Sequence, residues 1–559
     1  RQMCIRDSPS TDTPEQPSTD VTTDGYTITL GSAMATNASA EVASVSNNVC
    51  TIKQPGVFTV TGEMTGGQIV VDVDKTAYPD GVVELALSGM SLTNTSDSPI
   101  YVASIGDEVV ISAKNGTENT ISDGTSYTNA DSDTGAIYSK DDIKFKGKGT
   151  LTVNGNAADA IVGKDDVKIY NGSLIVNAKD DGIRGKDSVT IGNTSSDGTE
   201  VDYSNLSVKV KTEGGDGIKA TSTEASSTAK QVGIVTINGG AVNIESYADG
   251  ISAEQFFVMN GGDLNIKTYQ GSGFTGSAAG GNTGGWGGFG GMGMDGNANK
   301  TDISAKGIKA VGLYDEAGTT WQSVGNIDIN GGNITIDSSD DAVHCGGSMN
   351  LYGGTYTIAS ADDGFHSDHE LNIGKTAANT FDDVQIYISK CYEGIEGVTI
   401  NQNSGTVYII SGDDGYNAAG GADGSGFGNT GGGWGGGMMS SSTGTLNING
   451  GLIVANSANG DHDAIDSNGD INLNGGYVCA NGQEPLDCGD SGNTINYKGG
   501  SVITMTAGNT NLSQRYSFVD NSGIVIVAFI SASGTPGQNC TNCTAHSGGT
   551  VSGGKTVNA

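Results

Sequence analysis

Two acidic pairs, each followed by a histidine, stand close together in one stretch of the sequence. Segment 340–344 reads DDAVH and segment 362–366 reads DDGFH, which places the two pairs 22 residues apart. If the segments occupied the same place in stacked repeats, their carboxylates would lie about 4.8 Å apart, the spacing of neighbouring strands. Two carboxylates that close repel by roughly 3 kcal/mol at an effective dielectric constant near 20. The motif therefore predicts that a bound cation or another positive group neutralises the stacked carboxylates.

A similar short acidic segment, which we call the acidic corner because we expect a turn there, recurs along the chain. It opens ADAIVGKDDVKI from residue 158, DDGIRGKDSVTI from 180, ADGISAEQFFVMNGG from 248 and HDAIDSNGDINLNGG from 462. Aligning the repeats gives one position in each, which we call the corner column: Asp159, Asp181, Asp216, Asp249, Lys306, Asp341, Asp363, Glu393, Asp414 and Asp463. An Asn-Gly-Gly signature recurs in the middle of many repeats, where glycine permits the positive φ of a tight corner.

These repeats predict a parallel β-helix. Their shortest spacings are 21 and 22 residues, and apolar and polar residues alternate over short runs, as in strands. A period of that length with two or three short strands suits one coil stacked on its neighbours. The Leu-x-x-Leu-x-Leu frame of a leucine-rich repeat is absent. We therefore expect an all-β, single-stranded parallel β-helix with Gly-rich loop insertions where the spacing lengthens.

The amino-acid composition limits the kinds of molecule that the protein is expected to bind. The 559 residues include 91 Gly and only 8 Pro, and the formal net charge is −36. Such a charge disfavours nucleic acid and anionic membranes and favours cations. No apolar run approaches the length of a membrane-spanning helix, so no membrane insertion is expected. The 8 cysteines are too few for a disulfide framework in a chain of this length.

The ends of the chain lack the repeat pattern. Residues 1–24 are expected to form a disordered linker, and residues 1–8 (RQMCIRDS) resemble a cloning or sequencing remnant. The β-helix is expected over 25–551, and 552–559 form a tail at which the pattern breaks off, as in a truncated chain. Residues 1–8 lack the apolar region of a signal peptide, which leaves open an export signal upstream of this sequence.

The doubled acidic corners predict calcium, a hard cation that takes several oxygen ligands in irregular geometry. The alternative is that each Asp accepts a backbone N–H at its turn, which explains one carboxylate per corner better than two. The expected ligands are Asp180, Asp181, Asp216, Asp249, Asp340, Asp341, Asp362, Asp363, Glu393, Asp413, Asp414 and Asp463.

Three residues after each corner lies a second column, which alternation predicts to face outward. It comprises Val162, Arg184, Lys219, Ser252, Lys309, His344, His366, Glu396, Asn417 and Asp466. Its cations either compensate the corner carboxylates or form a basic strip for uronic-acid polymers. We expect His344 and His366 to be structural or to contact sugar, with a transition-metal site involving Asp368 and His369 as the lesser alternative.

Two glycine-rich insertions carry aromatic residues, at 271–300 and 420–442. They are either flexible loops or platforms on which Trp286, Phe289, Phe427 and Trp434 stack against sugar rings.

The segments GTENTISDG, DDGIRGKDSVTI, NGGDLNI and SSDDAVHCGGSMNLYGGTYTI resemble a bacterial family of secreted carbohydrate-binding proteins. The resemblance extends from about Gly25 to Val551. It implies a right-handed, polysaccharide-lyase-like β-helix that binds cellulose and acidic sugars, with calcium on aligned carboxylates, at the cell surface or outside the cell. Lys306 in an acidic position and the Cys-rich end depart from it, which puts an unbroken row of metal ions in doubt.

Three functions follow from these observations. The first is a non-catalytic, calcium-stabilised protein that binds plant glucan or acidic polysaccharide, with Arg184, Lys219, Lys309, His344, His366, Trp286 and Trp434 as the sugar-binding residues. The second is a calcium-dependent polysaccharide lyase, whose base would be one of Lys186, Lys219, Lys306, Lys309 or Arg184. A base needs partial burial to lower its pKa, and we expect these residues to be too solvated. The third is an adhesin or structural stalk.

Overall fold

The computed structural model describes an all-β protein. The described residues are 25–128, 135–195, 199–227, 230–275, 304–313, 322–376, 380–419, 444–457, 463–482, 484–488, 493–506, 515–519, 525–529 and 543–546. Within them the single helix is a 3-10 turn, η1 (Gly271–Gly273). No helix of the described residues has both the length and the apolar character needed to cross a membrane. The expected linker 1–24, most of both glycine-rich insertions and the tail 552–559 lie outside the described residues.

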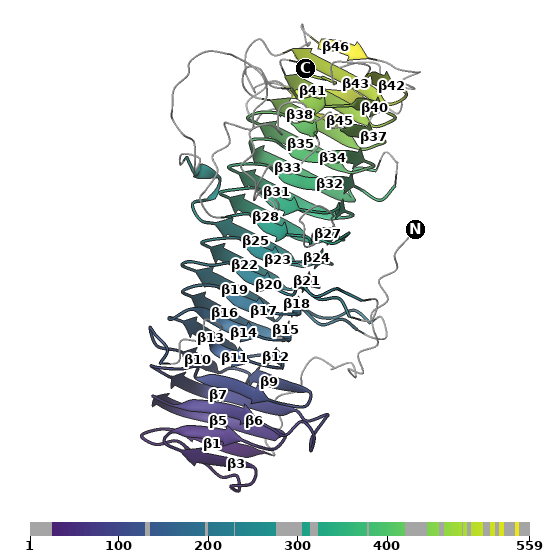
Figure 1. The fold of residues 1–559 in the computed structure, drawn as a ribbon. Coiled ribbons are helices and arrows are strands. Elements are labelled where there is room, and N and C mark those ends of the chain that lie inside the picture. The colour runs from purple at the N-terminus through teal and green to yellow at the C-terminus, as the bar shows by residue number, and fades with distance from the viewer. Residues whose placement is uncertain are drawn as a thin grey trace, which may run out of the picture. The chain divides into compact units, whose positions relative to one another are not determined.

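The chain divides into two compact units, 1–264 and 265–559. In the first unit most strands pair in parallel with a strand of the next repeat, so that successive repeats lie side by side (Figure 1). One ladder contains β4 (Val49–Ile52), β6 (Gln68–Asp72), β8 (Ile100–Ser104), β11 (Gly135–Ser139), β14 (Asp159–Gly163), β17 (Ile183–Gly185), β20 (Ile218–Ala220) and β23 (Ile251–Ala253).

Two further ladders of the first unit separate after β7 (Val83–Thr93), which pairs in parallel with β5 (Gly56–Thr65), as β5 does with β1 (Tyr26–Leu30). One continues through β9 (Glu108–Ala113), β12 (Asp142–Gly147), β15 (Asp166–Ile169), β18 (Ser188–Ile191), β21 (Ile234–Ile237) and β24 (Phe256–Met259). The other continues through β10 (Glu118–Ser122), β13 (Thr150–Gly155), β16 (Gly172–Ala178), β19 (Leu206–Thr212) and β22 (Ala241–Ser246). At the start of the unit, β1 (Tyr26–Leu30) pairs with β2 (Ala35–Thr36), and β3 (Ala43–Ser46) with β4, both antiparallel.

The second unit repeats the arrangement after β25 (Asp263–Thr268), which crosses the boundary. The ladder after the corners contains β26 (Ile308–Ala310), β29 (Val343–Cys345), the start of β32 (Phe365–Ile373), the start of β34 (Ile395–Gln402), β36 (Tyr416–Ala418) and β39 (Ile465–Ser467). The next contains β27 (Asn326–Ile329), β30 (Met349–Leu351), the ends of β32 and β34, β37 (Thr445–Ile448), β40 (Asp470–Leu473) and β42 (Ile495–Tyr497).

The third ladder of this unit contains β28 (Asn333–Ser338), β31 (Gly354–Ser360), β33 (Val384–Lys390), β35 (Thr406–Ser411), β38 (Leu452–Ser457), β41 (Tyr477–Gly482) and β43 (Ser501–Thr506). Towards the C-terminus the pairing becomes antiparallel, between β43 and β46 (Cys543–His546) and between β44 (Arg515–Val519) and β45 (Val525–Phe529).

Aliphatic side chains hold the repeats in register. In the first unit Ile161, Ile183, Ile218 and Ile251 occupy matching positions of neighbouring strands and are fully buried. A shift by one residue would expose this column, because alternate side chains of a strand face opposite sides. The Asn-Gly-Gly corners behave as expected: Gly262 has φ +93°, and an added Cβ would lie 2.6 Å from the carbonyl oxygen of Gly240.

Candidate functional site

The corner column is a stack of carboxylates joined by backbone hydrogen bonds. In the first unit the backbone N–H of Asp181 donates to Asp159 Oδ1 (3.0 Å), that of Asp216 to Asp181 Oδ1 (2.8 Å) and that of Asp249 to Asp216 Oδ1 (2.9 Å). In the second unit the N–H of Asp363 donates to Asp341 Oδ1 (3.2 Å). One oxygen of each of these carboxylates thus accepts a hydrogen bond from the backbone N–H of the next corner. This agrees with the alternative to calcium, in which the corner acids accept backbone N–H groups.

In the first unit, cations of the chain occupy the other carboxylate oxygens. Arg184 Nε lies 2.7 Å from Asp159 Oδ2, and Lys219 Nζ lies 2.8 Å from Asp216 Oδ2 and 3.6 Å from Asp181 Oδ2. Burial raises the pKa of Asp159 to about 6, against the lowering effect of Arg184. Burial and Asp249 raise the pKa of Asp216 to about 7, although Lys219 lowers it. This geometry favours charge compensation by Arg184 and Lys219 over a freely available basic strip.

Lys306 is buried in the corner column of the second unit. Its Nζ lies 3.0 Å from Asp340 Oδ1 and also contacts Asp341 Oδ2, and no part of its side chain is exposed. The expectation that every candidate basic residue would be solvated is therefore wrong for Lys306. A lysine here replaces one carboxylate of the stack and neutralises the doubled pair of the next repeat.

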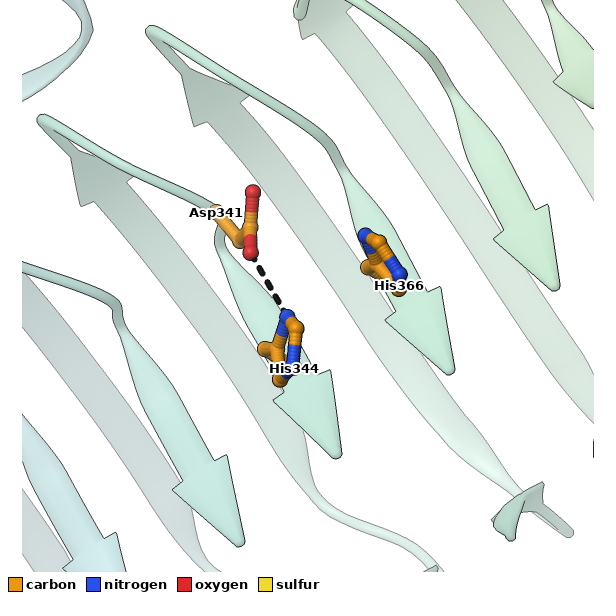
Figure 2. A group of neighbouring side chains, drawn as sticks. All are labelled: Asp341, His344 and His366. Carbon is orange, nitrogen blue, oxygen red and sulfur yellow. Dashed lines mark hydrogen bonds and ion pairs between the residues drawn. The ribbon is translucent and has the colours of Figure 1, made fainter. Parts of the chain in front are cut away.

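His344 and His366 are also buried, with exposed fractions of 3% and 1%. The second column is therefore not exposed at these positions, because carboxylates cover the side of the short strands that alternation turns away from the core. Buried rings offer no surface to a polysaccharide, so we do not retain the expected sugar contact. Figure 2 shows the two rings on neighbouring strands β29 and β32, with Asp341 hydrogen-bonded to His344.

Carboxylates hold both rings by Nδ1. His344 Nδ1 lies 2.8 Å from Asp341 Oδ2, and His366 Nδ1 lies 3.0 Å from Glu396 Oε2 and 3.3 Å from Asp363 Oδ2. Burial would lower the pKa of His366, but the surrounding Glu396 and Asp363 raise it well above its ordinary value. Burial would raise the pKa of Asp341, yet Lys306 and His344 hold it well below its usual range.

A second acidic group lies further along the second unit. Carboxylate oxygens of Asp463, Asp466 and Asp487 lie within 4.8 Å of one another. Burial and neighbouring carboxylates raise the pKa of Asp463 to about 7 and of Asp466 to about 6. The pKa of Asp414 rises to about 8 for the same reasons. Within the described residues none of these four carboxylates forms an ion pair with a basic side chain, so like charges remain uncompensated there. We call Asp414, Asp463, Asp466 and Asp487 the acidic end.

The remaining predicted residues are scattered. The backbone N–H of Glu393 donates to Asp363 Oδ1 (3.1 Å), and Lys309 is half-buried with Nζ 3.1 Å from Ser304 Oγ. Of the paired acids, Asp340 and Asp362 are buried, Asp413 is half-buried and Asp180 is exposed. Trp286, Phe289, Phe427 and Trp434 lie outside the described residues.

Sequence reasoning missed two contributions. Asp487 belongs to no corner motif, so its position beside Asp463 and Asp466 could not be read from the repeats. The role of Glu396 as a partner of His366 could have been inferred, because both belong to the second column of successive repeats.

One exposed sheet face combines an aromatic side chain with hydroxyl and amide groups. Tyr387 of β33 is 48% exposed and has Thr357 of β31 and Tyr408 of β35 as its neighbours in register. Thr355, Thr357 and Gln385 on the same face are exposed. We call these five residues the tyrosine face.

Comparisons with known proteins find similar sequences and a similar structure. A family model described as carbohydrate-binding domain-containing protein matches residues 46–364. A carbohydrate-binding domain-containing protein of Acetivibrio thermocellus is 37% identical over 139 residues, which cover 24% of this chain and 47% of the relative. The chain therefore spans about half the length of that curated relative. A solved structure, the gadolinium derivative of the polysaccharide lyase-like protein from C. thermocellum, has a TM-score of 0.32 and 22% identity, covering 63% of this chain and 97% of that chain. Because the family model spans more than half of its residues, the chain belongs to the family of carbohydrate-binding domain-containing proteins.

Proposed function

We propose that this protein is a non-catalytic polysaccharide-binding protein of the cell surface or secretome. Its repeats would wind as a right-handed parallel β-helix, and calcium would stabilise its acidic end. Membership of the carbohydrate-binding domain family is the observation that carries the binding function. The parallel pairing of strands between successive repeats supports the β-helix.

The tyrosine face is the best-supported sugar-binding surface among the described residues. Tyrosine offers an apolar ring for a sugar's C–H groups and a polar tip for its hydroxyls. The neighbouring Thr355, Thr357 and Gln385 add side-chain donors and acceptors on one flat, rigid sheet. A binding site on strands loses little conformational entropy when a glycan docks.

The acidic end is the best-supported calcium site. Its carboxylates supply hard oxygen ligands, and no basic side chain of the described residues pairs with them. Nearby in the second column, Asn417 donates from Nδ2 to Glu393 Oε2 (2.8 Å), while its buried Oδ1 has no hydrogen-bond partner among the described residues. An amide oxygen of this kind is an acceptable calcium ligand. At Asp341, by contrast, Lys306 already supplies positive charge.

The environment of the candidate bases supports a lyase less well than a binding protein. Lys306 is the most deeply buried of the expected bases, and its ammonium is enclosed by two carboxylates without access to a substrate. Arg184 and Lys219 are ion-paired to corner carboxylates. A stalk would have no use for an exposed aromatic face, and the experiment below separates it from a binding protein.

Affinity electrophoresis in gels containing a soluble β-glucan or polygalacturonate tests the proposal. The Tyr387→Ala variant should bind the retarding polysaccharide about tenfold more weakly than the unmodified protein, which corresponds to roughly 1.4 kcal/mol. Tyr247→Ala is the matched control, because Tyr247 is also exposed (38%) but belongs to the first unit and not to the tyrosine face. Equal retardation of the two variants would remove the tyrosine face from the proposal, and no retardation by any polysaccharide would favour the stalk.

A further inference from the structure

Two imidazole nitrogens in the second unit converge on one carboxylate oxygen. His366 Nε2 lies 3.4 Å from Asp368 Oδ1, and His344 Nε2 lies 3.7 Å from the same oxygen. All three residues are buried, with Asp368 the most exposed at 8%. None of these three residues belongs to the tyrosine face or to the acidic end.

The separations fit shared coordination better than direct hydrogen bonds. An N–H···O bond in a protein spans about 2.7–3.2 Å, so both separations are longer than a direct bond. Ligands held at about 2.0–2.1 Å by one tetrahedral ion lie roughly 3.3–3.4 Å from each other. The 3.4 Å separation equals such an edge, and the 3.7 Å separation needs an adjustment of a few tenths of an ångström.

The opposite nitrogen of each ring is already fixed. An ionised carboxylate has no proton to give, so Nδ1 of His344 donates to Asp341 Oδ2. Nδ1 of His366 donates to Asp363 Oδ2 (3.3 Å) and also lies 3.0 Å from Glu396 Oε2. A metal ion would replace the proton on Nε2 of a protonated ring, and each imidazole would then present its Nε2 lone pair towards Asp368. Metal-binding histidines are commonly oriented in the same way, by a carboxylate on the other nitrogen.

The backbone places Asp368 at a β-bulge. Between the paired positions Ser367↔Gly397 and Glu370↔Thr399, strand β32 has one residue more than β34. A bulge of this kind re-aims side chains and is common beside functional sites. Here it directs Asp368 to the histidines of its own strand and of β29, while the next residue, His369, is exposed.

Charge gives an independent reason for a cation. Around the two rings lie Asp340, Asp341, Asp362, Asp363, Asp368, Glu393 and Glu396, all buried or half-buried. Lys306 pairs with Asp340 and Asp341 of this group. Even with both imidazoles protonated, the carboxylates outnumber the positive charges, and an excess of buried like charge is costly.

We propose that His344 Nε2, His366 Nε2 and Asp368 Oδ1 bind a divalent transition-metal ion of the zinc class. Two imidazoles and a carboxylate select such an ion, whereas calcium and magnesium prefer an all-oxygen set. Asp341 and Glu396 orient the rings from the outer side and are not ligands. The site is independent of the proposed glycan binding and of the proposed calcium at the acidic end.

The test uses the full chain, stripped with chelator and titrated with Co²⁺ and then Zn²⁺. The unmodified protein should bind one Co²⁺ with the visible absorption of nitrogen-containing, low-coordinate cobalt, and Zn²⁺ should displace it. Excess Ca²⁺ should leave the spectrum unchanged. His366→Gln and Asp368→Asn should each lose at least tenfold in Zn²⁺ affinity, measured against a chromophoric chelator.

His369→Gln is the matched control, because it removes an exposed imidazole next to the site without touching the converging atoms. Circular dichroism and the melting curve establish that each variant folds. If His366→Gln fails to fold, Asp368→Asn at the edge of the cluster decides the question. Loss of the cobalt spectrum in His369→Gln, its retention in Asp368→Asn, or displacement of Co²⁺ by equimolar Ca²⁺ would overturn the proposal. So would the absence of any cobalt spectrum, which would identify the cluster as an imidazolium–carboxylate network.

Discussion

Asp341 shows how one carboxylate can serve two structural tasks. Oδ1 accepts the backbone N–H of Asp363 and so ties one repeat to the next, while Oδ2 faces Lys306 and His344. The side chain is fully buried, and its charge is tolerable because both oxygens have partners. The corner column is therefore a set of local solutions to one problem, which use Arg184, Lys219, Lys306 or a histidine at different repeats.

Replacing Lys306 by methionine should be strongly destabilising. The change leaves Asp340 and Asp341 buried without their shared cation, and breaking a buried ion pair in this way costs about 3–5 kcal/mol. Urea unfolding followed by circular dichroism measures the loss. Lys309→Met is the control, since Lys309 is only half-buried and donates to a serine hydroxyl. An unfolding midpoint equal to that of the control would show that Lys306 is not the compensating charge.

At the level of elements, the second glycine of each Asn-Gly-Gly corner sets the turn between strands. Gly262→Ala should lower stability by about 1–3 kcal/mol, because alanine at φ +93° is strained and its Cβ would meet the carbonyl oxygen of Gly240. Gly261→Ala is the matched control, since its Cβ would have only an ordinary contact, at 3.6 Å. Thermal melting distinguishes the two, and equal melting temperatures would contradict this account of the corner.

Much of the strand pattern could be predicted from the sequence, and the burial of the site could not. Alternation and the 22-residue spacing place Asp341 and Asp363 in one column, as the register of β29 and β32 confirms. The same alternation predicts an outward His344 and His366, because it assumes that an outward side chain meets water. Here carboxylates contributed by turns and by the bulge at Asp368 cover that side. The bulge adds one residue to a single repeat and so carries no periodic signal, and Asp487 belongs to no corner motif, so neither could be found from the repeats.

At the scale of the whole molecule, the excess of acid should make stability depend on pH in the metal-free protein. The folded-state pKa values of Asp414, Asp463 and Asp466, about 8, 7 and 6, lie above the ordinary value of an unfolded Asp near 4. The unfolded chain thus releases these protons first. The contribution of these three groups to folding stability is therefore fully present below about pH 4 and is lost as pH rises through their folded-state pKa values. Melting temperatures in chelator across this window measure the effect.

Calcium should reverse that decline. A cation that binds the ionised carboxylates stabilises the folded state by an amount that grows with the logarithm of its free concentration over its dissociation constant. Added Ca²⁺ should therefore raise the melting temperature more at pH 8 than at pH 5. The Asp463→Asn/Asp466→Asn double variant should lose this calcium response and show a flatter pH profile. A calcium response that is unchanged in the double variant would place the ion elsewhere in the chain.

We propose that the protein binds polysaccharide without cleaving it. Depletion of the full chain from solution by insoluble cellulose and by calcium-gelled polygalacturonate tests this most directly, with ultraviolet absorbance of the supernatant reporting unsaturated uronates. We predict retention on at least one polymer, glucan binding that survives chelation, and no unsaturated product. Calcium-dependent release of unsaturated sugars would contradict the account in favour of a lyase, and full recovery of the protein from every polymer would contradict binding itself.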